Sequence, residues 1–281
     1  MSRALAIHGA GGRMGRAIAE VVARGGQGQE GQEPEEGATL VVTGAIEREG
    51  SPLVGQDFGV VTAARESGVA ITASLSDGLA GADVAIDFTG PASTRRFVAA
   101  CADLGVPAVV GTTGLDAETL AALDAAAAKV PVVFAPNMSV GVNVLFHLAA
   151  QAAALMGPEF DAEIVEMHHR HKVDAPSGTA QRLAEVVAEA KGLDLARDAV
   201  HGRSGQVGVR RDAEIGVMTL RGGDVVGEHT LYLAGAGERV ELTHRATDRA
   251  IFARGAVRAA RWAIGRDAGR YDMGDVLGLG G

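Results

Sequence analysis

The first half of the chain alternates short apolar runs with longer stretches in which apolar residues recur at helical spacing. The short runs predict buried strands at residues 4–8, 40–46, 70–72, 84–88, 108–111 and 132–135. The longer stretches predict helices at residues 14–23, 92–103 and 117–128. Such alternation is typical of a parallel, doubly wound sheet. The segment from Gly25 to Gly37, rich in glycine, glutamine and glutamate, interrupts it and is predicted to be a mobile surface loop.

The pattern changes after residue 139. A long apolar helix is predicted at residues 140–156, a strand at 162–167 and a helix at 180–190. Three strand-like runs then follow without intervening helices, at residues 214–220, 228–234 and 239–244. Adjacent strands of this kind predict an open antiparallel or mixed sheet, and hence a second domain. The helical stretch at 249–262 carries small residues that suit close packing, and we expect it to return to the first domain.

Composition describes a globular protein. Of the 281 residues, 47% are apolar and 22% are charged, and the formal net charge is −9. This acidic balance argues against a nucleic-acid or anionic-membrane partner. No apolar run reaches the roughly 18 residues that a membrane span requires, and the first residues lack the pattern of a signal peptide. We therefore expect a cytoplasmic protein.

The single cysteine, Cys101, excludes an internal disulfide and fits a reducing compartment. Its apolar neighbours in residues 97–102 predict the buried side of a helix, and hence an inert packing role. Aromatic residues make up only 4% of the chain, which argues against a platform for stacking bases or sugars.

A glycine-rich turn follows the first predicted strand and opens the first predicted helix. Glycines at positions 9, 12 and 15 form the pattern G-x-x-G-x-x-G, and position 11 adds a G-x-G element. Only glycine lets backbone N–H groups approach a pyrophosphate this closely, and the helix N-terminus then stabilises its charge. An ordinary glycine turn is the alternative, but the placement favours a dinucleotide site. The predicted cofactor contacts in this turn are Gly9, Ala10, Gly11, Gly12, Arg13 and Met14.

The second predicted strand ends in charged residues that suit a ribose. Glu47 is predicted to accept hydrogen bonds from both ribose hydroxyls, as NADH requires. Arg48 beside it is predicted to pair with the 2′-phosphate of NADPH. An acid next to a base predicts use of both cofactors, whereas a solvated charged turn is the alternative.

Further turns follow the later strands of the same predicted sheet. Ligands bind at the carboxyl ends of parallel strands, so we expect the turns at 87–91, 111–114 and 135–138 to border the nicotinamide half of the cofactor. The predicted contacts are Gly111, Thr112, Thr113, Ala135, Pro136, Asn137 and Met138.

Residues 168–172 concentrate positive charge and proton-transfer capacity. This run reads His168, His169, Arg170, His171 and Lys172. Histidine exchanges protons near neutral pH, and the cations suit an anionic substrate such as a carboxylate. Zinc is the competing interpretation, but the spacing does not match the helical His pair of H-E-x-x-H, and neighbouring cations would repel a metal. No metal site is expected.

A helix start follows this cationic run at once. Pro176 cannot donate a backbone hydrogen bond, and residues 177–179 offer free N–H groups before an amphipathic stretch. The N-terminus of a helix attracts anions. We therefore expect cations and helix amides to meet at one carboxylate-binding site.

Together these segments resemble the family of 4-hydroxy-tetrahydrodipicolinate reductase, also called dihydrodipicolinate reductase, of bacterial lysine and diaminopimelate synthesis. The resemblance covers nearly the whole chain and is most specific in residues 166–180. It is carried by residues 9–15, 46–50, 87–89, 111–114, 137–143, 166–180, 221–230 and 241–246. The long insertion before the second strand and Met138, where phenylalanine is frequent, are the departures.

The resemblance implies an α/β fold. A Rossmann-like dinucleotide-binding domain would comprise residues 1–138 and 248–281, and a substrate-binding and oligomerisation domain with an open mixed sheet would comprise residues 139–247. The same resemblance implies a homotetramer built from those sheets and NADH or NADPH as hydride donor.

The resemblance also implies roles for particular side chains. His168 would be the general acid, with Lys172 as its cationic partner. His169 would touch the substrate, and Gly178 and Thr179 would hold one of its carboxylates. For the charged and titratable residues of this run the alternatives are His168 as a structural histidine, Lys172 as a surface lysine, Arg170 as a surface or interface cation, and one of His169 and His171 as a structural or interfacial residue.

The expected reaction is reduction of a cyclic dicarboxylate, with hydride from the nicotinamide and a proton from His168. Two alternatives remain open. One is another nicotinamide-dependent reductase with the same fold, and the other is a regulator that senses NAD(P) without turnover.

Overall fold

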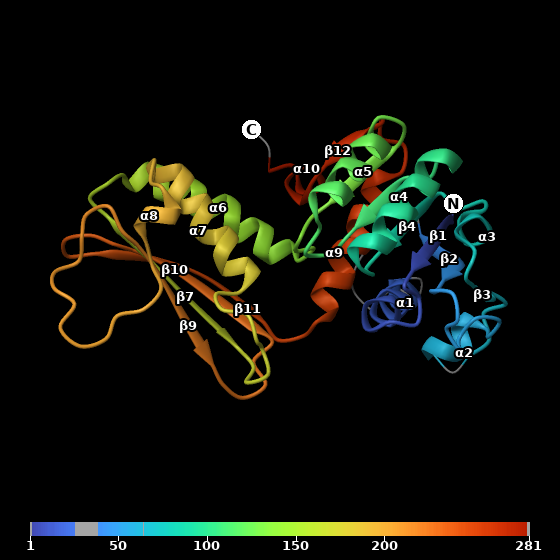
Figure 1. Ribbon diagram of the computed structural model, residues 1–281, viewed down its shortest axis with the longest axis horizontal. Coiled ribbons are helices and arrows are strands. Elements are labelled where there is room, and N and C mark those ends of the chain that lie inside the picture. The colour runs from blue at the N-terminus through green and yellow to red at the C-terminus, as the bar shows by residue number, and fades with distance from the viewer. Residues whose placement is uncertain (1, 26–38, 64, 280–281) are drawn as a thin grey trace. The chain divides into compact units, whose positions relative to one another are not determined.

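The computed structural model describes residues 2–25, 39–63 and 65–279, and the expected loop between Gly25 and Gly37 lies almost entirely outside them (Figure 1). The chain divides into two compact units. Unit 1 comprises Met1–Ser139 and Ala250–Gly281, and unit 2 comprises Val140–Arg249. Each unit has its own sheet, which confirms the predicted fold class. The roles assigned above to the two domains remain predictions.

Unit 1 contains a seven-stranded sheet in the order β12-β6-β5-β4-β1-β2-β3, in which all neighbouring strands run parallel. Its strands are β1 (Arg3–His8), β2 (Leu40–Ile46), β3 (Ile71–Thr72), β4 (Val84–Asp87), β5 (Ala108–Val110), β6 (Pro131–Phe134) and β12 (Gly269–Tyr271). The order reverses between β1 and β4, which is the position where doubly wound sheets bind ligands.

Seven helices are described in unit 1. They are α1 (Arg13–Gly25), α2 (Phe58–Ala63), α3 (Leu75–Leu79), α4 (Pro91–Leu104), α5 (Ala117–Ala127), α9 (Ala250–Ala263) and α10 (Met273–Leu277). α4 packs against α5, whereas α9 packs against α1 and the strands β4 to β6. The expected return of residues 249–262 to the first sheet is therefore observed.

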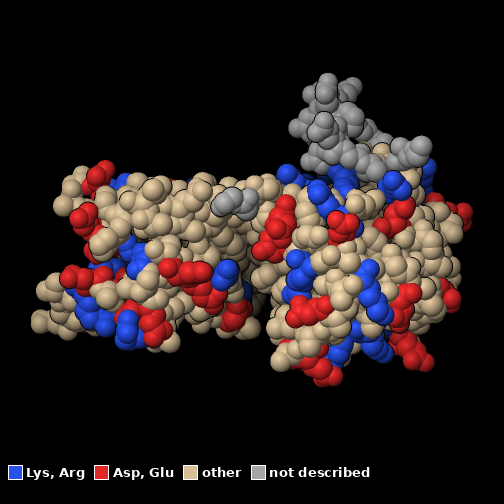
Figure 2. Space-filling model, turned by 90° about the horizontal axis from the view of Figure 1, so that it is seen from above, with Lys and Arg blue, Asp and Glu red and all other residues tan. Residues whose placement is uncertain are grey.

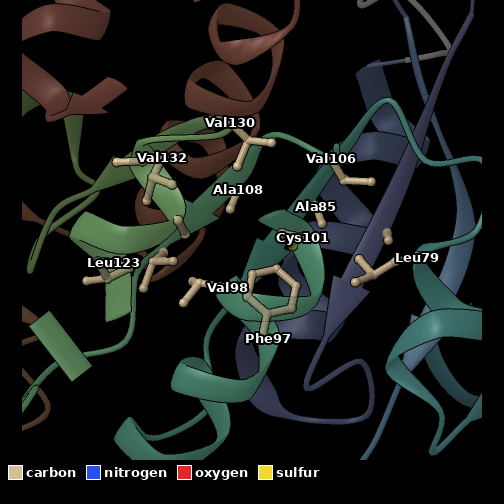
Figure 3. Close-up of a cluster of buried hydrophobic side chains, with 14 of the residues drawn as sticks. Leu79, Ala85, Phe97, Val98, Cys101, Val106, Ala108, Leu123, Val130 and Val132 are labelled. Atoms are coloured by element: carbon tan, nitrogen blue, oxygen red, sulfur yellow. The ribbon is translucent and has the colours of Figure 1, made fainter. Parts of the chain in front are cut away.

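The core beneath α4 and α5 explains why these helices form where they do. Phe97, Val98 and Cys101 recur at helical spacing on α4 and face Leu123 of α5 and the strand residue Ala108 (Figure 3). Each of these side chains is fully buried, and apolar burial of this kind is the main stabilising contribution to a fold. Cys101 is a free, buried cysteine, as predicted, and burial raises the pKa of its thiol.

Two glycines allow close approach of helices to turns. A Cβ atom on Gly15 would lie 2.4 Å from the carbonyl oxygen of Gly9, so α1 begins directly against the glycine turn. A Cβ atom on Gly255 would lie 1.7 Å from the carbonyl oxygen of Met138, so α9 packs onto the turn after β6. A larger residue at either position would displace backbone atoms.

Unit 2 contains a five-stranded mixed sheet in the order β11-β10-β7-β9-β8. Its strands are β7 (Asp161–His168), β8 (Ala199–Val200), β9 (Ile215–Arg221), β10 (Gly227–Ala234) and β11 (Arg239–Ala246). β7 runs parallel to β9 and antiparallel to β10. The helices α6 (Val140–Met156) and α7 (Gly178–Lys191) cover one side of the sheet, and α8 (Leu195–Asp198) is a single short turn (Figure 1).

The alternation of side chains along β7 assigns its residues to the two faces. Ala162, Ile164, Glu166 and His168 are buried on the face covered by α6 and α7. The residues between them lie on the second face, called here the open face. Its half-buried or exposed members include Val165, Met167, Met218, Leu220, Thr230 and Tyr232. On the helix-covered side of β7, two apolar residues are thus followed by two polar ones, Glu166 and His168.

The long helices and strands are those that the pattern of apolar residues predicts, whereas several short elements were not predicted from it. α2, α3, α8, α10, β8 and β12 have at most six residues each, too few to display a period. Within the described residues, no helix combines the length and apolar character that crossing a membrane would require. Acidic and basic side chains intermix over the described part of the face drawn in Figure 2.

Candidate functional site

The glycine turn joins β1 to α1 at the carboxyl ends of the parallel strands. Gly9 has φ +80°, in the left-handed region that favours glycine. The backbone N–H groups of Gly9 and Ala10 both donate to the carbonyl oxygen of Ile46, at 2.9 and 3.1 Å. This turn is therefore anchored to the end of β2, and the adjoining residues Arg13 and Met14 start α1.

Glu47 lies against this turn, as its position after β2 leads one to expect. Its Oε1 atom accepts a hydrogen bond of 2.8 Å from the N–H group of Gly11. Arg48, the next residue, is exposed. The acid and the base therefore have different surroundings: Glu47 is hydrogen-bonded to the glycine turn, and Arg48 is exposed to solvent.

Asp87 joins the turns after β4 and β5, and the sequence alone did not reveal this role. The carboxylate is fully buried and accepts hydrogen bonds from the hydroxyl groups of Thr89, Thr94 and Thr112, at 2.7, 2.5 and 2.8 Å. His8 Nδ1 also lies 2.8 Å from its Oδ1 atom. The Thr112 hydroxyl also accepts a hydrogen bond from the N–H group of Thr89, so the turn after β4 and the turn after β5 are held together.

The remaining predicted cofactor residues follow the ends of neighbouring strands. Gly111 and Thr112 are buried and Thr113 is exposed, just after β5. A Cβ atom on Gly111 would lie 2.2 Å from the ring of Phe88, so a side chain there would displace that ring. The residues after β6 are Ala135, Pro136, Asn137 and Met138. All the predicted cofactor residues thus lie in turns, or in the first turn of α1, at one edge of the unit 1 sheet, although their contacts with a cofactor remain predictions.

In unit 2, His168 ends β7 with a buried carboxylate beside it. Glu166 Oε2 lies 2.5 Å from His168 Nδ1, and the guanidinium of Arg221 donates to both Glu166 oxygens at 2.9 and 3.0 Å. Glu166 is fully buried, and His168 is 8% exposed. Burial alone would raise the pKa of Glu166, but hydrogen bonds from His168 and Arg221 outweigh it and lower the pKa to about 2. Glu166 is therefore ionised at neutral pH.

His229 lies on the other side of His168. The two rings meet edge to face with centroids 5.1 Å apart, and His229 Nε2 lies 3.0 Å from the hydroxyl of Ser177. His229 is 3% exposed, and its Nδ1 atom has no hydrogen-bond partner among the described residues. Burial, reinforced by the positive potential of His168, lowers the pKa of His229 to about 3. His229 is therefore neutral at physiological pH.

The cationic loop after β7 is less buried. Lys172 Nζ donates to Asp174 Oδ1 at 2.8 Å, and this pairing lowers the pKa of Asp174. The rings of His169 and His171 lie 6.2 Å apart, with His171 exposed. Partial burial and the charge of Arg249 lower the pKa of His169. The loop thus presents a lysine ammonium and an imidazole that favours its neutral form.

The helix start predicted after this loop is present. Ser177 is the N-cap of α7, and its hydroxyl accepts the N–H group of Ala180 at 3.1 Å. Gly178 and Thr179 are the first two helical residues, with Gly178 exposed. N–H groups in this first helical turn are suited to an anion.

Unit 2 therefore holds every predicted catalytic and substrate residue in one segment, residues 168–179, which joins β7 to α7. Sequence reasoning assigned no role to Glu166, Arg221 or His229. Alternation along β7 was the available signal for Glu166, because it puts positions 166 and 168 on the same face. No such signal was available for Arg221 and His229, because the strand register brings them to the site. It pairs His168 with Arg221 and Glu166 with His229.

Comparison with known proteins covers both units. Family models described as dihydrodipicolinate reductase, N-terminus, and dihydrodipicolinate reductase, C-terminus, match residues 3–138 and 141–277. The chain is 53% identical to a 4-hydroxy-tetrahydrodipicolinate reductase of Thiobacillus denitrificans, over 99% of this chain and 100% of the relative. It is 52% identical to the protein of that name from Alkalilimnicola ehrlichii, with the same coverage.

A solved structure also resembles the chain. It is a dipicolinate-bound dihydrodipicolinate reductase from Paenisporosarcina sp. TG-14, with a TM-score of 0.70 and 22% sequence identity. The match covers 97% of this chain and 98% of that one. At this identity the likeness supports the fold.

Proposed function

The chain belongs to the dihydrodipicolinate reductase family, and from that membership we infer that it reduces 4-hydroxy-tetrahydrodipicolinate (dihydrodipicolinate) to tetrahydrodipicolinate in lysine and diaminopimelate biosynthesis. The observation that carries this inference is full-length identity of 53% to a relative with that named activity. The buried pairing of Glu166 with His168 supports it, because reduction of a conjugated ring needs a proton as well as a hydride.

A nicotinamide cofactor supplies the hydride in this reaction when it is bound. The glycine turn fits its pyrophosphate, because Gly9 has a positive φ and Gly15 lets α1 begin directly against the turn. Glu47 would bind the ribose hydroxyls, and Arg48 would bind a 2′-phosphate. Both NADH and NADPH are therefore proposed as cofactors.

His168 is the proposed proton donor, with Lys172 holding a substrate carboxylate and stabilising the negative charge that forms during transfer. The N–H groups of Gly178 and Thr179 at the start of α7 would fix the second carboxylate, and His169 would touch the ring or its substituents. A dicarboxylate with both ends held presents one face of its ring in a defined orientation.

The proposed assembly is a homotetramer formed through the open face of the unit 2 sheet. That face carries Val165, Met218, Leu220 and Tyr232, half-buried or exposed apolar side chains of the kind that oligomer interfaces cover. Sedimentation analysis of the purified chain tests it, since a monomer at working concentration would contradict the proposal. A cytoplasmic location and the absence of a nucleic-acid partner remain predictions.

The decisive experiment follows nicotinamide absorbance while the purified chain acts on enzymatically generated substrate, with NADH and NADPH tested separately. Oxidation of either cofactor that depends on the substrate supports the proposed function. Cofactor binding without any turnover would instead favour the alternative that the chain is a regulator that senses NAD(P). Turnover with a different imine or oxo acid alone would identify another reductase of the same fold.

A further inference from the structure

The carboxylate of Glu166 serves two parts of the site with its two oxygens. Besides their shared contacts with Arg221, each oxygen has partners of its own. Oε2 accepts from Nδ1 of His168 at 2.5 Å. Oε1 accepts from the backbone N–H group of Ser177 at 3.1 Å and from the hydroxyl of Thr219 at 3.1 Å.

We propose that Glu166 is a positioning residue that fixes both the imidazole of His168 and the turn that opens α7. This inference rests on the proposed function, since it takes His168 as the proton donor and the start of α7 as a carboxylate site. It adds a residue that would not touch the substrate but would set where two substrate-binding groups lie.

The first consequence concerns the proton on the imidazole ring. An ionised carboxylate can only accept a hydrogen bond, so His168 Nδ1 carries hydrogen in this contact. The neutral ring therefore has its lone pair on Nε2, and the protonated ring presents Nε2–H as its free donor. Gly227 lies beside Nε2. A Cβ atom on this residue would lie only 2.9 Å from that nitrogen, so any larger residue would crowd the imidazole.

The second consequence concerns the carboxylate-binding turn. Ser177 directly precedes Gly178 and Thr179, and its N–H group points to Glu166. Its hydroxyl is already used to cap α7 and to contact His229. Since α7 and β7 are joined by an exposed loop, this hydrogen bond fixes the first turn of the helix relative to His168.

Charged and titratable groups approach His168 from several elements of unit 2. They are Glu166 on β7, Arg221 on β9, His229 on β10 with His244 of β11 beside it, and His169 and Lys172 in the following loop. Glu166 is the anion that contacts the imidazole itself, whereas Asp174, in the same loop, pairs with Lys172. A carboxylate in contact with the ring stabilises the positive charge of a protonated imidazole, whereas the neutral amide of a glutamine would not.

A purely structural role accounts poorly for this arrangement. Burying a carboxylate with a guanidinium gives little net stability compared with apolar side chains of similar size. The orientation of an imidazole, by contrast, needs an acceptor at this position, and a carboxylate is the usual orienting partner of a histidine that exchanges protons.

The test is Glu166→Gln in the full-length chain, with imidazole-nitrogen NMR on isotope-labelled histidine and a pH–rate profile. The His168 signals are assigned by their loss in His168→Gln. We expect neutral His168 to carry its hydrogen on Nδ1 in the wild type and to shift toward the Nε2–H form in Glu166→Gln. The high-pH limb of the rate profile should move down by about one pH unit or more, and kcat at neutral pH should fall roughly tenfold or more.

Glu163→Gln is the matched control. Glu163 lies on the same strand but bonds to Arg203 and Arg210 instead of His168, so this variant should keep the wild-type tautomer and pH profile. An unchanged tautomer and unchanged pH profile in Glu166→Gln would overturn the inference. If that variant does not fold, the wild type alone decides, because a neutral His168 protonated on Nε2 is incompatible with the proposal.

The two proposals fail in different ways. Full activity in His168→Gln would remove His168 as the acid and leave the tautomer measurement standing. A wild-type Nε2–H tautomer together with a large loss of activity in His168→Gln would keep the proposed function and reject the positioning role of Glu166.

Discussion

Gly227 of β10 lies beside the outer nitrogen of His168: a Cβ atom built on Gly227 would be only 2.9 Å from His168 Nε2. The backbone of Gly227 does not have the positive φ that strains other residues, so the steric conflict is confined to the imidazole. A side chain at position 227 would therefore crowd the nitrogen from which His168 is proposed to donate its proton.

Gly227→Ala should consequently reduce activity while the fold persists. A displacement of the imidazole by a few tenths of an ångström or more misaligns proton transfer, and we expect kcat to fall on the order of tenfold to 100-fold. Steady-state kinetics measures this, with thermal unfolding and cofactor binding as controls. Wild-type kcat would show that the space beside Nε2 is not used.

His168→Gln should lower kcat by at least ~100-fold, which is the usual contribution of a general acid. Cofactor affinity should stay close to that of the wild type, because all the predicted cofactor residues belong to unit 1. His201→Gln is the matched control, since His201 is an exposed histidine elsewhere in unit 2. Equal rates for the two variants would exclude His168 as the proton donor.

Arg48→Ala should change the cofactor preference. Arg48 is exposed next to Glu47 and is the proposed partner of the 2′-phosphate. Loss of a charge-assisted contact should raise the KM for NADPH about tenfold to 100-fold and leave the KM for NADH almost unchanged. Comparison of the two constants in one preparation measures the effect. A parallel change in both would show that Arg48 does not discriminate between them.

His229 should make the stability of unit 2 depend on pH. The pKa of His229 is lowered from 6.5 to about 3 in the fold, so below pH 6.5 the unfolded chain binds a proton that the folded chain does not. Stability should therefore be complete above pH 6.5 and decline as pH falls from 6.5 toward 3.

Chemical denaturation at several pH values provides the measurement, with His229→Gln as the comparison. The variant should lose less stability than the wild type between pH 6 and 4.5, whatever its stability at neutral pH. Glu166 adds a decline at lower pH, because its folded pKa of about 2 lies below the ordinary value of 4.5. Identical pH slopes in the two proteins would contradict the assignment to His229.

Some residues of the candidate site could be predicted from their neighbours in the sequence, and others could not. The glycine turn, Glu47 and the run from His168 to Lys172 are continuous in sequence, and each was found because its chemistry depends on neighbouring residues. Asp87 lies in one of the predicted turns, but its role could not be predicted, because its three hydroxyl partners are up to 25 residues away. Arg221 lies 55 residues from Glu166, beyond any periodic signal.

The amino-acid sequence alone is sufficient to predict the long helices and strands, the two types of sheet and the segments that carry the chemistry. Those features depend on apolar periodicity, on glycine conformation and on helix starts, which act over a few residues. The position of Glu166 between His168, Ser177 and Arg221, by contrast, is known only from the folded chain. The register of β7 against β9 and β10 brings these residues together, and that register follows from burial of one whole face of the sheet against α6 and α7.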